Sequence, residues 1–515
     1  MKQKRFPKWL WKLFRRRMLI AVLIIAQAAF FIYLVASGSM VSQQLSRILT
    51  VVSVLVVLYI VSKRDKGAYK TLWVFLILCF PILGGLLYLI VTCQSATRVM
   101  RRDIQKAQEK TRQLYSMPGD DYEEAEKRTG SHFPQVRYLQ NYVGYSVYAN
   151  TRTTYLCPGE QFHKALLTQL EKAEHYIFLE FFIVQEGVFW DSILEILKRK
   201  ASQGVKVRLI YDDLGCFFML PTDFVKQMEH SGIECAIFNP FRPLLTVKQN
   251  NRDHRKIVVI DGKVAFTGGI NLADEYINAY EKHGHWKDTA VMLEGKAAWS
   301  FTMLFLQMWE LTTGKEEDCE VYYPWRGCPL PTFSDGYAAP YADTPHDGDN
   351  VGEHVYLQIL HNAKHYVYIN TPYLILDDSI LSALCLAAKS GVDIRITTPH
   401  KADKWWVHMT TRSYYRQLLE AGVKIYEYTP GFLHAKSFVS DDAVAAIGSV
   451  NLDFRSLYLH FECGVWLYGG RAVAQLRDDY LQTLACCQPI TAEDCRHRLP
   501  VRLLQACLRL VAPLM

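Results

Sequence analysis

Two copies of one short pattern carry the residues of this chain that could perform chemistry. The pattern is H-x-K-x4-D, and its six residues are His254, Lys256 and Asp261 in the first copy and His434, Lys436 and Asp441 in the second. A turn of small residues that ends in asparagine follows each copy at the same distance, at 268–271 and at 448–451. A single short motif is weak evidence. Two copies with matching turns indicate one shared functional site.

The residue types in this pattern suit phosphoryl transfer through a covalent intermediate. An imidazole titrates near pH 6.5, so it can serve as a nucleophile or as a proton carrier, and an ammonium group neutralises phosphate oxygens. Apolar runs follow each copy and predict strands, on which residues i and i+2 point to the same side. Histidine and lysine of each copy therefore share a face, and two histidines allow one to attack and one to protonate the leaving oxygen.

Neither decay of one copy nor metal binding accounts as well for the two motifs. One copy could be a decayed scaffold, but both copies keep all three residues, so we expect both to be catalytic. The histidines could be metal ligands, but no H-E-x-x-H or paired C-x-x-C pattern accompanies them. We therefore expect neither a metal nor a cofactor.

The motifs lie within an internal duplication. Residues 173–182 resemble 363–372, 202–210 resemble 389–397, and 231–240 resemble 421–430, in the same order in both halves. Each half alternates short β-branched and aromatic runs with helical stretches that end in glycine. This alternation predicts an α/β fold with two similar lobes, each built on a mixed sheet.

Longer segments around the motifs resemble the phospholipase D superfamily and, within it, the bacterial cardiolipin synthases. They are HRKIVVIDGKVAFTGGINLADEY, GHWKDTAV, INTPYLILDD, AGVKIYEY and LHAKSFVSDDAVAAIGSVNLDFRSLYLHFE. The resemblance covers almost the whole chain. It implies that the two pseudo-symmetric lobes form one active site at their interface, with a phosphohistidine intermediate. It also implies that His254 is the nucleophile and that His434 acts as acid and then as base, roles that spacing alone does not assign.

The same resemblance suggests supporting residues. Asn271 and Asn451 lie on the matching turns and would donate hydrogen bonds to phosphate oxygens, although turn formation alone also explains asparagine there. Ser449 has Gly269 as its counterpart in the first lobe, which makes the expected phosphate site asymmetric.

Two carboxylates are expected to orient the histidines. Glu462 follows Asn451 by eleven residues and matches the family carboxylate that orients the histidine of its own motif. In the first lobe that spacing falls on Lys282, so Asp288 is the expected carboxylate there. A buried carboxylate beside an imidazole also stabilises its charged form.

The first hundred residues contain three apolar segments, at 18–37, 48–61 and 71–93. A helix needs about twenty apolar residues to cross the bilayer, so the first and third are long enough and the second is short. The first is too long for a secretory signal and is followed by further segments, which indicates an uncleaved anchor. We expect a multi-pass protein of the cell membrane.

The charges that flank these segments conflict about sidedness. Basic clusters precede the first segment, separate the second from the third and follow the third, so all three regions favour the cytoplasm. Three crossings cannot satisfy them together. The 13 cysteines lack a disulfide-like spacing and favour a reducing compartment. We therefore expect two to three transmembrane helices and a catalytic part that faces the cytoplasm.

These observations define the expected domains. They are a membrane-anchoring segment at 1–97, a charged linker at 98–135, a first phospholipase D-like lobe at 136–315, a connecting segment at 316–350, a second lobe at 351–490 and a basic amphipathic tail at 491–515. In the tail, arginines alternate with leucines at helical spacing, as in an interfacial helix, although a terminal helix packed on the second lobe fits equally. Trp405 and Trp406 either border the substrate cleft or pack in the core.

Composition and resemblance together favour work on anionic membrane lipid. The formal net charge is +7. The resemblance implies a membrane phosphatidyltransferase that joins two phosphatidylglycerol molecules into cardiolipin and releases glycerol. A phospholipase D, or a transferase with another alcohol acceptor, is the alternative. A superfamily nuclease is disfavoured by the membrane segments and by the lack of a basic aromatic stripe, so we expect no nucleic acid. The sequence makes no prediction of oligomeric state.

Overall fold

The structure, a computed structural model, resolves two compact units. The described residues are 29, 40–63, 66–80, 84–85, 88, 95–115, 121–241, 247–326, 332–333, 335–345 and 348–515. The first unit comprises 1–99 with 241–250, and the second comprises 100–240 with 251–515.

The first unit contains two packed helices, α2 (Met40–Ser62) and α3 (Gly67–Cys79). They meet through Ile60, Ile77 and Tyr88, which are all at most 4% exposed. None of the helices that the structure describes has the length together with the hydropathy that a membrane crossing needs. The expected segment at 18–37 lies outside the described residues apart from residue 29, and 71–93 is described only in part. The transmembrane helices therefore stay a prediction.

The second unit contains two sheets of closely similar topology. The first has the order β1-β8-β6-β5-β2-β3-β4 and the second β17-β12-β11-β10-β14-β15-β16-β9. The first sheet consists of β1 (Thr151–Leu156), β2 (Tyr176–Phe181), β3 (Lys206–Asp212), β4 (Ile233–Phe238), β5 (Lys256–Ile260), β6 (Val264–Gly268) and β8 (Ala290–Gly295). The second consists of β9 (Tyr337–Asp343), β10 (Tyr366–Asn370), β11 (Asp393–Pro399), β12 (Lys424–Tyr428), β14 (Ser437–Ser440), β15 (Val444–Gly448), β16 (Glu462–Tyr468) and β17 (Cys487–Ile490).

Each sheet joins a parallel half to an antiparallel half. β2, β3 and β4 are parallel, as are β10, β11 and β12. The hairpin strands β5 and β6, or β14 and β15, continue each sheet in antiparallel pairing. The three parallel strands of each half begin inside the three sequence blocks that resemble one another, and β3 and β11 extend two residues beyond theirs. The predicted α/β fold with two duplicated lobes on mixed sheets is confirmed.

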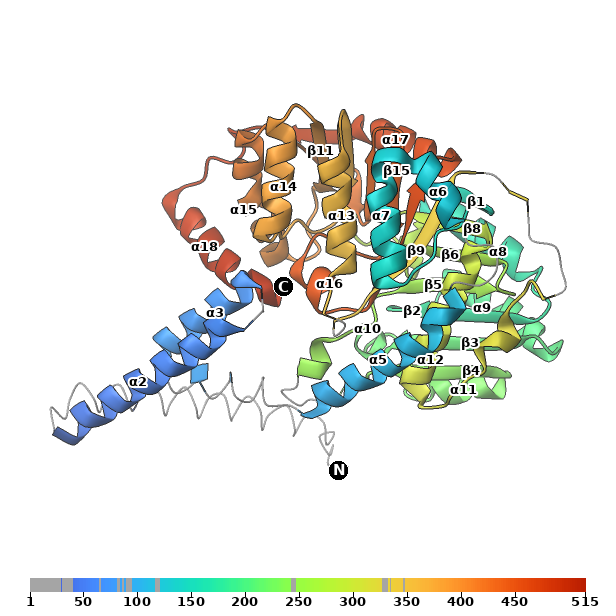
Figure 1. The fold of residues 1–515 in the computed structure, drawn as a ribbon, viewed down its shortest axis with the longest axis horizontal. Helices are drawn as coiled ribbons and strands as arrows, with labels where there is room; N and C mark the ends of the chain where they lie inside the picture. The colour runs from blue at the N-terminus through green and yellow to red at the C-terminus, as the bar shows by residue number, and fades with distance from the viewer. Residues whose placement is uncertain are drawn as a thin grey trace, which may run out of the picture. The chain divides into compact units, whose positions relative to one another are not determined.

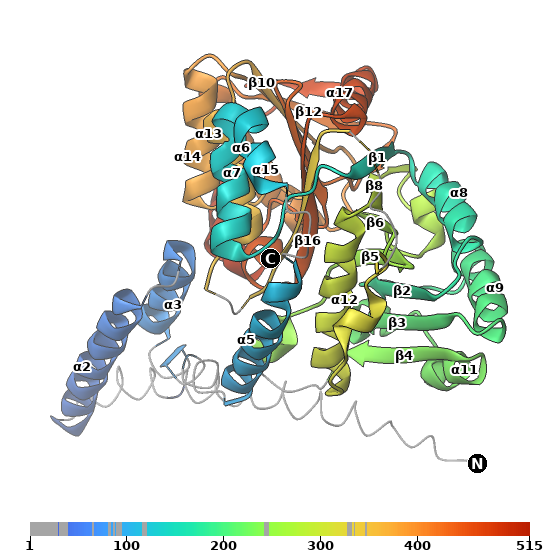
Figure 2. The same ribbon diagram turned by 45° about the vertical axis from the view of Figure 1, so that its right-hand side comes forward.

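Helices cover both faces of each sheet. Those of the first lobe are α8 (Gly159–Leu170), α9 (Val188–Ser202), α11 (Phe224–His230) and α12 (Ala297–Thr313), and those of the second are α13 (Val351–Asn362), α14 (Asp378–Lys389), α15 (Trp405–Glu420) and α17 (Arg471–Leu484). Figure 2 shows α12 on one face of the first sheet and α8, α9 and α11 on the other. In α9 the buried positions 189, 190, 193, 196 and 197 follow the helical period, which explains why this segment forms a helix against the sheet.

Left-handed glycines end the helices that lead into the parallel strands. Gly204, Gly232, Gly391 and Gly422 have φ values of 91°, 76°, 95° and 98° and follow α9, α11, α14 and α15. Side chains with a Cβ disfavour this backbone region. The glycine-ended helical stretches expected from the sequence therefore have a physical cause.

One helix of each lobe also packs against the sheet of the other lobe. α12 of the first lobe packs against β9 of the second sheet, and α17 of the second lobe packs against β1 of the first. β9 lies within the predicted connecting segment at 316–350, so that segment also contributes a strand to the second sheet.

The expected linker at 98–135 is largely helical, with α5 (Ser95–Tyr115), α6 (Tyr122–Thr129) and α7 (Phe133–Arg137). Figure 1 shows α6 and α7 beside α13.

Candidate active site

The two motif histidines lie where the lobes meet, and each is held by the opposite lobe. His254 lies two residues before β5 begins, and its backbone N–H donates to the carbonyl of Phe461 at 2.9 Å. His434 follows β13 (Gly431–Leu433), which pairs in parallel with β7 (His285–Lys287) of the first lobe. The backbone N–H of His434 donates to the carbonyl of Lys287 at 2.7 Å. Backbone hydrogen bonds between the lobes thus fix both histidines.

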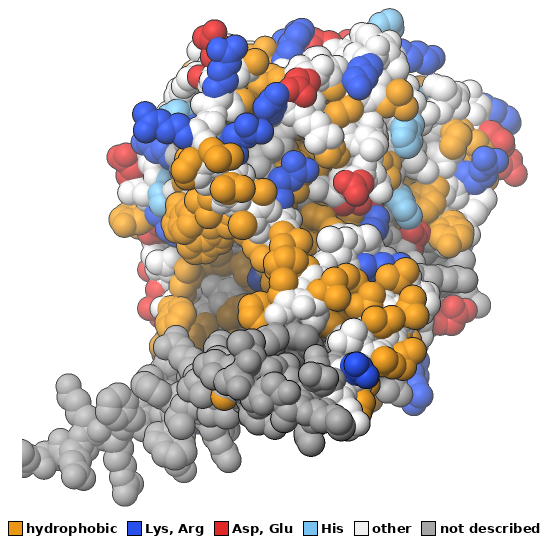
Figure 3. All heavy atoms as spheres, turned by 90° about the vertical axis from the view of Figure 1, so that its left-hand side faces the viewer, with side chains coloured by type: hydrophobic (Ala, Val, Ile, Leu, Met, Phe, Trp, Pro, Cys, Tyr) orange, Lys and Arg blue, Asp and Glu red, His pale blue; other side chains and the backbone are white. Residues whose placement is uncertain are grey.

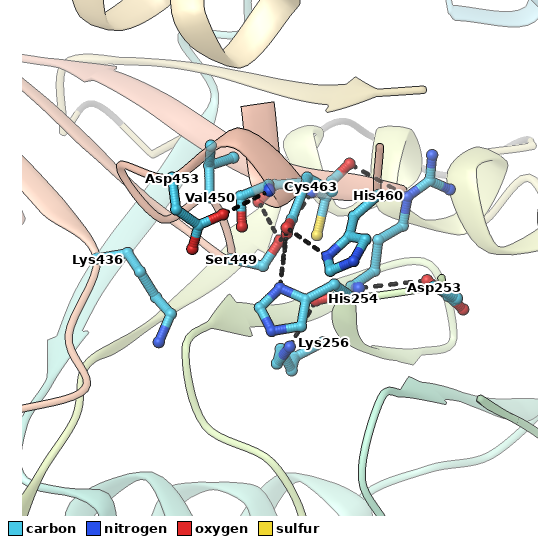
Figure 4. Close-up of polar contacts among 12 residues, drawn as sticks. Asp253, His254, Lys256, Lys436, Ser449, Val450, Asp453, His460 and Cys463 are labelled. Carbon is cyan, nitrogen blue, oxygen red and sulfur yellow. Dashed lines mark hydrogen bonds and ion pairs between the residues drawn. The ribbon is translucent and has the colours of Figure 1, made fainter. Parts of the chain in front are cut away.

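The carboxylates that orient the imidazoles are crossed between the lobes. Glu462 accepts a hydrogen bond from His254 Nδ1 at 2.9 Å, and Asp288 accepts one from His434 Nδ1 at 2.6 Å. This pairing corrects the expectation that each carboxylate serves the histidine of its own lobe. The physical reason is the lobe interface: Glu462 begins β16 beside the 252–254 backbone, and Asp288 follows β7 beside β13. Figure 4 draws the hydrogen bonds around His254.

Both motif lysines are buried beside the histidines. Lys256 and Lys436 are 2% and 1% exposed, and each Nζ donates to the carbonyl of the histidine two residues before it. Burial lowers the pKa of Lys256 to about 8 and that of Lys436 to about 7. An anion between them would offset the cost of burying these charges. Each lysine thus lies against the histidine of its own copy, although both histidines lie outside β5 and β14.

Burial and mutual repulsion also shift the titration of the imidazoles. The pKa values of His254 and His434 both lie well below the ordinary histidine value, first because of burial and then because of the two lysines. Burial raises the pKa of Asp288 to about 7. The carboxyl of Asp288 can therefore itself hold a proton near neutral pH.

Asp261 and Asp441 of the motifs lie away from this cluster. Each ends its strand in a left-handed turn, with φ of 50° and 53°. Asp261 accepts three backbone N–H groups at the start of β2, from residues 174–176, and Asp441 accepts those of 364–366 at the start of β10. Five residues of strand rise about 17 Å. This distance corrects the expectation that the aspartates are catalytic, because they tie each hairpin to the neighbouring strand instead.

Two of the turn residues, Ser449 and Gly269, lie beside the carboxylates that orient the histidines. Ser449 donates to Glu462 and also accepts from the backbone N–H of Cys463 at 3.0 Å, so its hydroxyl supports the carboxylate. A Cβ at Gly269 would lie 2.2 Å from Asp288 Oδ1. A serine fits beside Glu462, whereas Asp288 approaches its turn too closely for a side chain at position 269.

The asparagines of these turns line the cavity. Asn271 accepts from the backbone N–H of Ile183 at 3.1 Å and donates to the hydroxyl of Tyr276 at 2.7 Å. Asn451 also lines the cavity. Their expected hydrogen bonds to phosphate stay a prediction.

His254 and His434 line a cavity of about 610 Å³ with largely apolar walls. The ring of Phe182 lies 5.1 Å from that of His254, and the rings of Tyr276 and Trp286 lie 5.4 Å from that of His434. Trp406 also lines the cavity, and neither Trp405 nor Trp406 is buried in the core. The cavity has room for a phosphodiester head group.

His460 is a cavity residue that the sequence reasoning missed. Its ring lies 5.6 Å from that of His254, and burial lowers its pKa to about 4. The signal in the sequence was its position two residues before Glu462. The ligand atoms of His254, His460 and Glu462 lie within 4.8 Å of one another and could hold a metal ion. The hydrogen bonds that Glu462 accepts from His254 and Ser449 satisfy it without one.

Comparison with known proteins agrees with this geometry. Residues 166–309 and 356–484 match the family described as "Cardiolipin synthase, PLD-like domain", and 48–91 match "Phospholipase_D-nuclease N-terminal". A cardiolipin synthase of Alkalihalophilus pseudofirmus is 35% identical over 474 residues, which are 90% of this chain and 92% of that one. Cardiolipin synthase 2 of Bacillus cereus is 34% identical over 464 residues, 88% of each chain.

A solved structure shares the fold. The phosphatidylserine synthase of Haemophilus influenzae Rd KW20 superposes with a TM-score of 0.58 at 14% identity, over 74% of this chain and 100% of that one. The sequence matches extend through both lobes and both motifs. This chain therefore belongs to the cardiolipin synthase family with phospholipase D-like domains.

Proposed function

We propose that this protein is a membrane phosphatidyltransferase that makes cardiolipin and glycerol from two molecules of phosphatidylglycerol. The observation that carries the proposal is the cluster of two histidines and two buried lysines at one cavity, with each histidine oriented by a carboxylate of the other lobe. The relatives named cardiolipin synthase support the substrate.

In the first step His254 attacks phosphorus. Glu462 accepts the Nδ1 proton of His254, which leaves a lone pair on Nε2 for the attack. A P–N bond forms, and the P–O bond to the head-group glycerol breaks. His434 gives the departing oxygen its proton, so glycerol leaves as a neutral alcohol.

In the second step His434 changes its role from acid to base. It takes the proton of a hydroxyl on the second phosphatidylglycerol, whose oxygen attacks the phosphohistidine. A new P–O bond forms, the P–N bond breaks, and His254 is regenerated. Asp288 stabilises the imidazolium that His434 becomes, since a carboxylate at 2.6 Å favours the charged ring.

The lysines hold the phosphate group through both steps. Burial depresses their pKa values, so an approaching phosphodiester anion favours their protonated forms. The resulting ammonium groups then stabilise the charge that builds on the phosphate oxygens in the transition state. Asn271 and Asn451 at the cavity wall would donate further hydrogen bonds to these oxygens.

Transfer prevails over hydrolysis because the cavity is apolar. Phe182, Tyr276 and Trp286 contact the imidazoles and leave little space for water beside them. A phospholipase D activity, or transfer to another alcohol, would use the same residues. The product distribution separates these alternatives.

The N-terminal region anchors the enzyme in the cell membrane. Support comes from the apolar segments of residues 1–97 and from the family match at 48–91. The catalytic lobes face the cytoplasm in this proposal, in line with cysteines that make no disulfides in the described part of the chain.

The test uses the purified full-length protein with phosphatidylglycerol as the sole lipid and without added metal. We expect cardiolipin and glycerol in equal amounts by mass spectrometry. The variants His254→Ala and His434→Ala should each abolish turnover, while Val188→Glu on the exposed surface should not. Phosphatidic acid as the main product would replace the transferase by a hydrolase. Normal turnover in either histidine variant would refute the two-histidine mechanism.

A further inference from the structure

The C-terminal helix α18 (Leu499–Leu510) turns its polar side towards the protein. It packs on α15, where Gln505 is only 9% exposed and contacts the sulfur of Met409 at 3.7 Å. The guanidinium of Arg509 lies over the ring of Tyr414 at 4.3 Å. The side of α18 that packs on the lobe thus contains an amide and a cation, together with the half-buried Val501 and Leu508.

The opposite side of α18 presents leucines to the exterior. Leu499, Leu503 and Leu504 are 67%, 59% and 40% exposed. A surface helix in water normally turns its apolar stripe to the core and its polar side outward. In α18 the most exposed leucines lie on the outer side while Gln505 and Arg509 face the lobe, which indicates an apolar partner on the outer side.

Further exposed apolar side chains lie at the mouth of the cavity. Trp406 and Leu514 line the cavity and are 42% and 54% exposed, and the neighbouring Trp405 is 60% exposed. On the first lobe, Phe218 is 89% exposed. It lies two residues after Cys216, whose Sγ contacts the carbonyl of the cavity-lining Phe182 at 3.6 Å. Apolar groups from both lobes therefore edge the cavity.

Cations accompany this apolar rim. Arg498 and Arg502 are exposed on α18, and Lys404 is exposed beside the tryptophans and lines the cavity. Figure 3 faces the side of the molecule that carries α18 in Figure 1, and it shows Lys and Arg side chains beside exposed hydrophobic ones. Leucines flanked by arginine, with tryptophans nearby, are typical of groups that lie in the head-group layer of an anionic bilayer.

We propose that α18, Trp405, Trp406 and Phe218 insert into the surface of an anionic phospholipid bilayer, so that the cavity opens directly onto the lipid. A lipid then reaches His254 with its head group in the cavity and its acyl chains still within the leaflet. The lipid head group inferred here rests on the proposed function, whereas the bilayer contact rests on the exposed surface alone. A bilayer explains the arginines and the position around a phosphodiester site, which an apolar protein partner would not require.

Photo-crosslinking tests the contact in the full-length protein. Benzoylphenylalanine replaces Leu503 in one preparation and Val188 in another, in vesicles of phosphatidylglycerol and phosphatidylcholine. Val188 begins α9 and is 63% exposed, and α9 lies at the opposite side of Figure 1 from α18. We expect lipid adducts by mass spectrometry from position 503 and none from position 188. No lipid adduct at 503, or a crosslink there to a second copy or to another segment of the chain, would overturn the proposal.

Activity measurements separate this inference from the proposed function. Leu503→Glu should lower transfer on vesicles about tenfold, the loss expected when one leucine no longer enters an apolar medium. The same variant should match the parent on monomeric short-chain phosphatidylglycerol, and Val188→Glu should match it on both substrates. Equal transfer on vesicles by Leu503→Glu would refute the bilayer contact. Absence of transfer by the parent on either substrate would refute the proposed function, and the crosslinking result would still decide the contact.

Discussion

Replacing Asp288 by asparagine should disable the acid that protonates the leaving alcohol. Asp288 Oδ2 lies 2.6 Å from His434 Nδ1, and Lys436 Nζ lies 2.8 Å from the same nitrogen. Asparagine keeps the shape of the side chain but removes its negative charge. The imidazolium of His434 then faces Lys436 without a counter-charge.

The size of the effect follows from this geometry. Removal of an opposite charge in direct contact lowers the pKa of a histidine by roughly 1–3. Burial already holds the pKa of His434 well below its ordinary value, so the protonated fraction near neutral pH falls further by the same factor. We expect about a hundredfold loss of cardiolipin formation, within the range of about 10²–10⁴ for general acid catalysis.

A change of leaving group isolates the acid step. p-Nitrophenol is a weak base and leaves without protonation, so a phosphatidyl p-nitrophenyl ester does not need His434 in the first step. Asp288→Asn should release the p-nitrophenol burst within about threefold of the parent rate, while its reaction with phosphatidylglycerol stays slow. Stopped-flow absorbance measures the burst.

Glu462→Gln is the matched control from the other lobe. It perturbs His254 through the 2.9 Å hydrogen bond, so the nucleophile is impaired with both leaving groups. We expect a slow burst from the p-nitrophenyl ester as well. If Glu462→Gln were rescued by the better leaving group and Asp288→Asn were not, the assignment of the crossed carboxylates to base and acid would be refuted.

Three further predictions follow from the described contacts. Gly269→Ala should reproduce the Asp288→Asn kinetics, because its Cβ would lie 2.2 Å from Asp288 Oδ1, and a normal rate with phosphatidylglycerol would contradict this reasoning. Asp261→Ala should lower the free energy of unfolding by about 3 kcal/mol, since it leaves three backbone N–H groups without their acceptor, but kcat of the folded fraction should change little. Thermal unfolding and active-site titration measure these two quantities, and a large fall in kcat without loss of stability would restore the catalytic role. Tungstate should bind with proton uptake and weaken as pH rises from 7 to 9, because Lys436 and Lys256 lose their protons near pH 7 and 8 in the free enzyme and an anion favours the charged forms. Inhibition constants across this pH range test the sign, and a pH-independent constant would contradict it.

Local sequence patterns were sufficient to predict the duplicated lobes. The blocks at 202–210 and 389–397 contain alternating or continuous apolar residues between glycine-ended helices, and these features depend only on the nearby chain. They correctly located β3 and β11. The two-residue period of a strand does not explain the proximity of histidine and lysine, because both histidines lie outside β5 and β14.

Local sequence patterns could not predict which residues contact the site residues. Glu462 orients His254 because the backbone bridge between Asp253 and Phe461 joins the lobes, and no spacing within one half encodes that contact. Asp261 belongs to the motif, but its distance from Lys256 is set by the length of β5. The aspartate therefore occurs in both motifs because each hairpin turn needs it.

The crossing of carboxylates between lobes makes the two halves of this chain interdependent. A half-length chain with one copy of the motif would carry a histidine and a lysine, but its carboxylate would extend away from its own imidazole. Two such chains related by a twofold axis would each complete the other. Within one chain the two sites need not be identical: a serine hydroxyl donates to Glu462, whereas a glycine leaves room for Asp288.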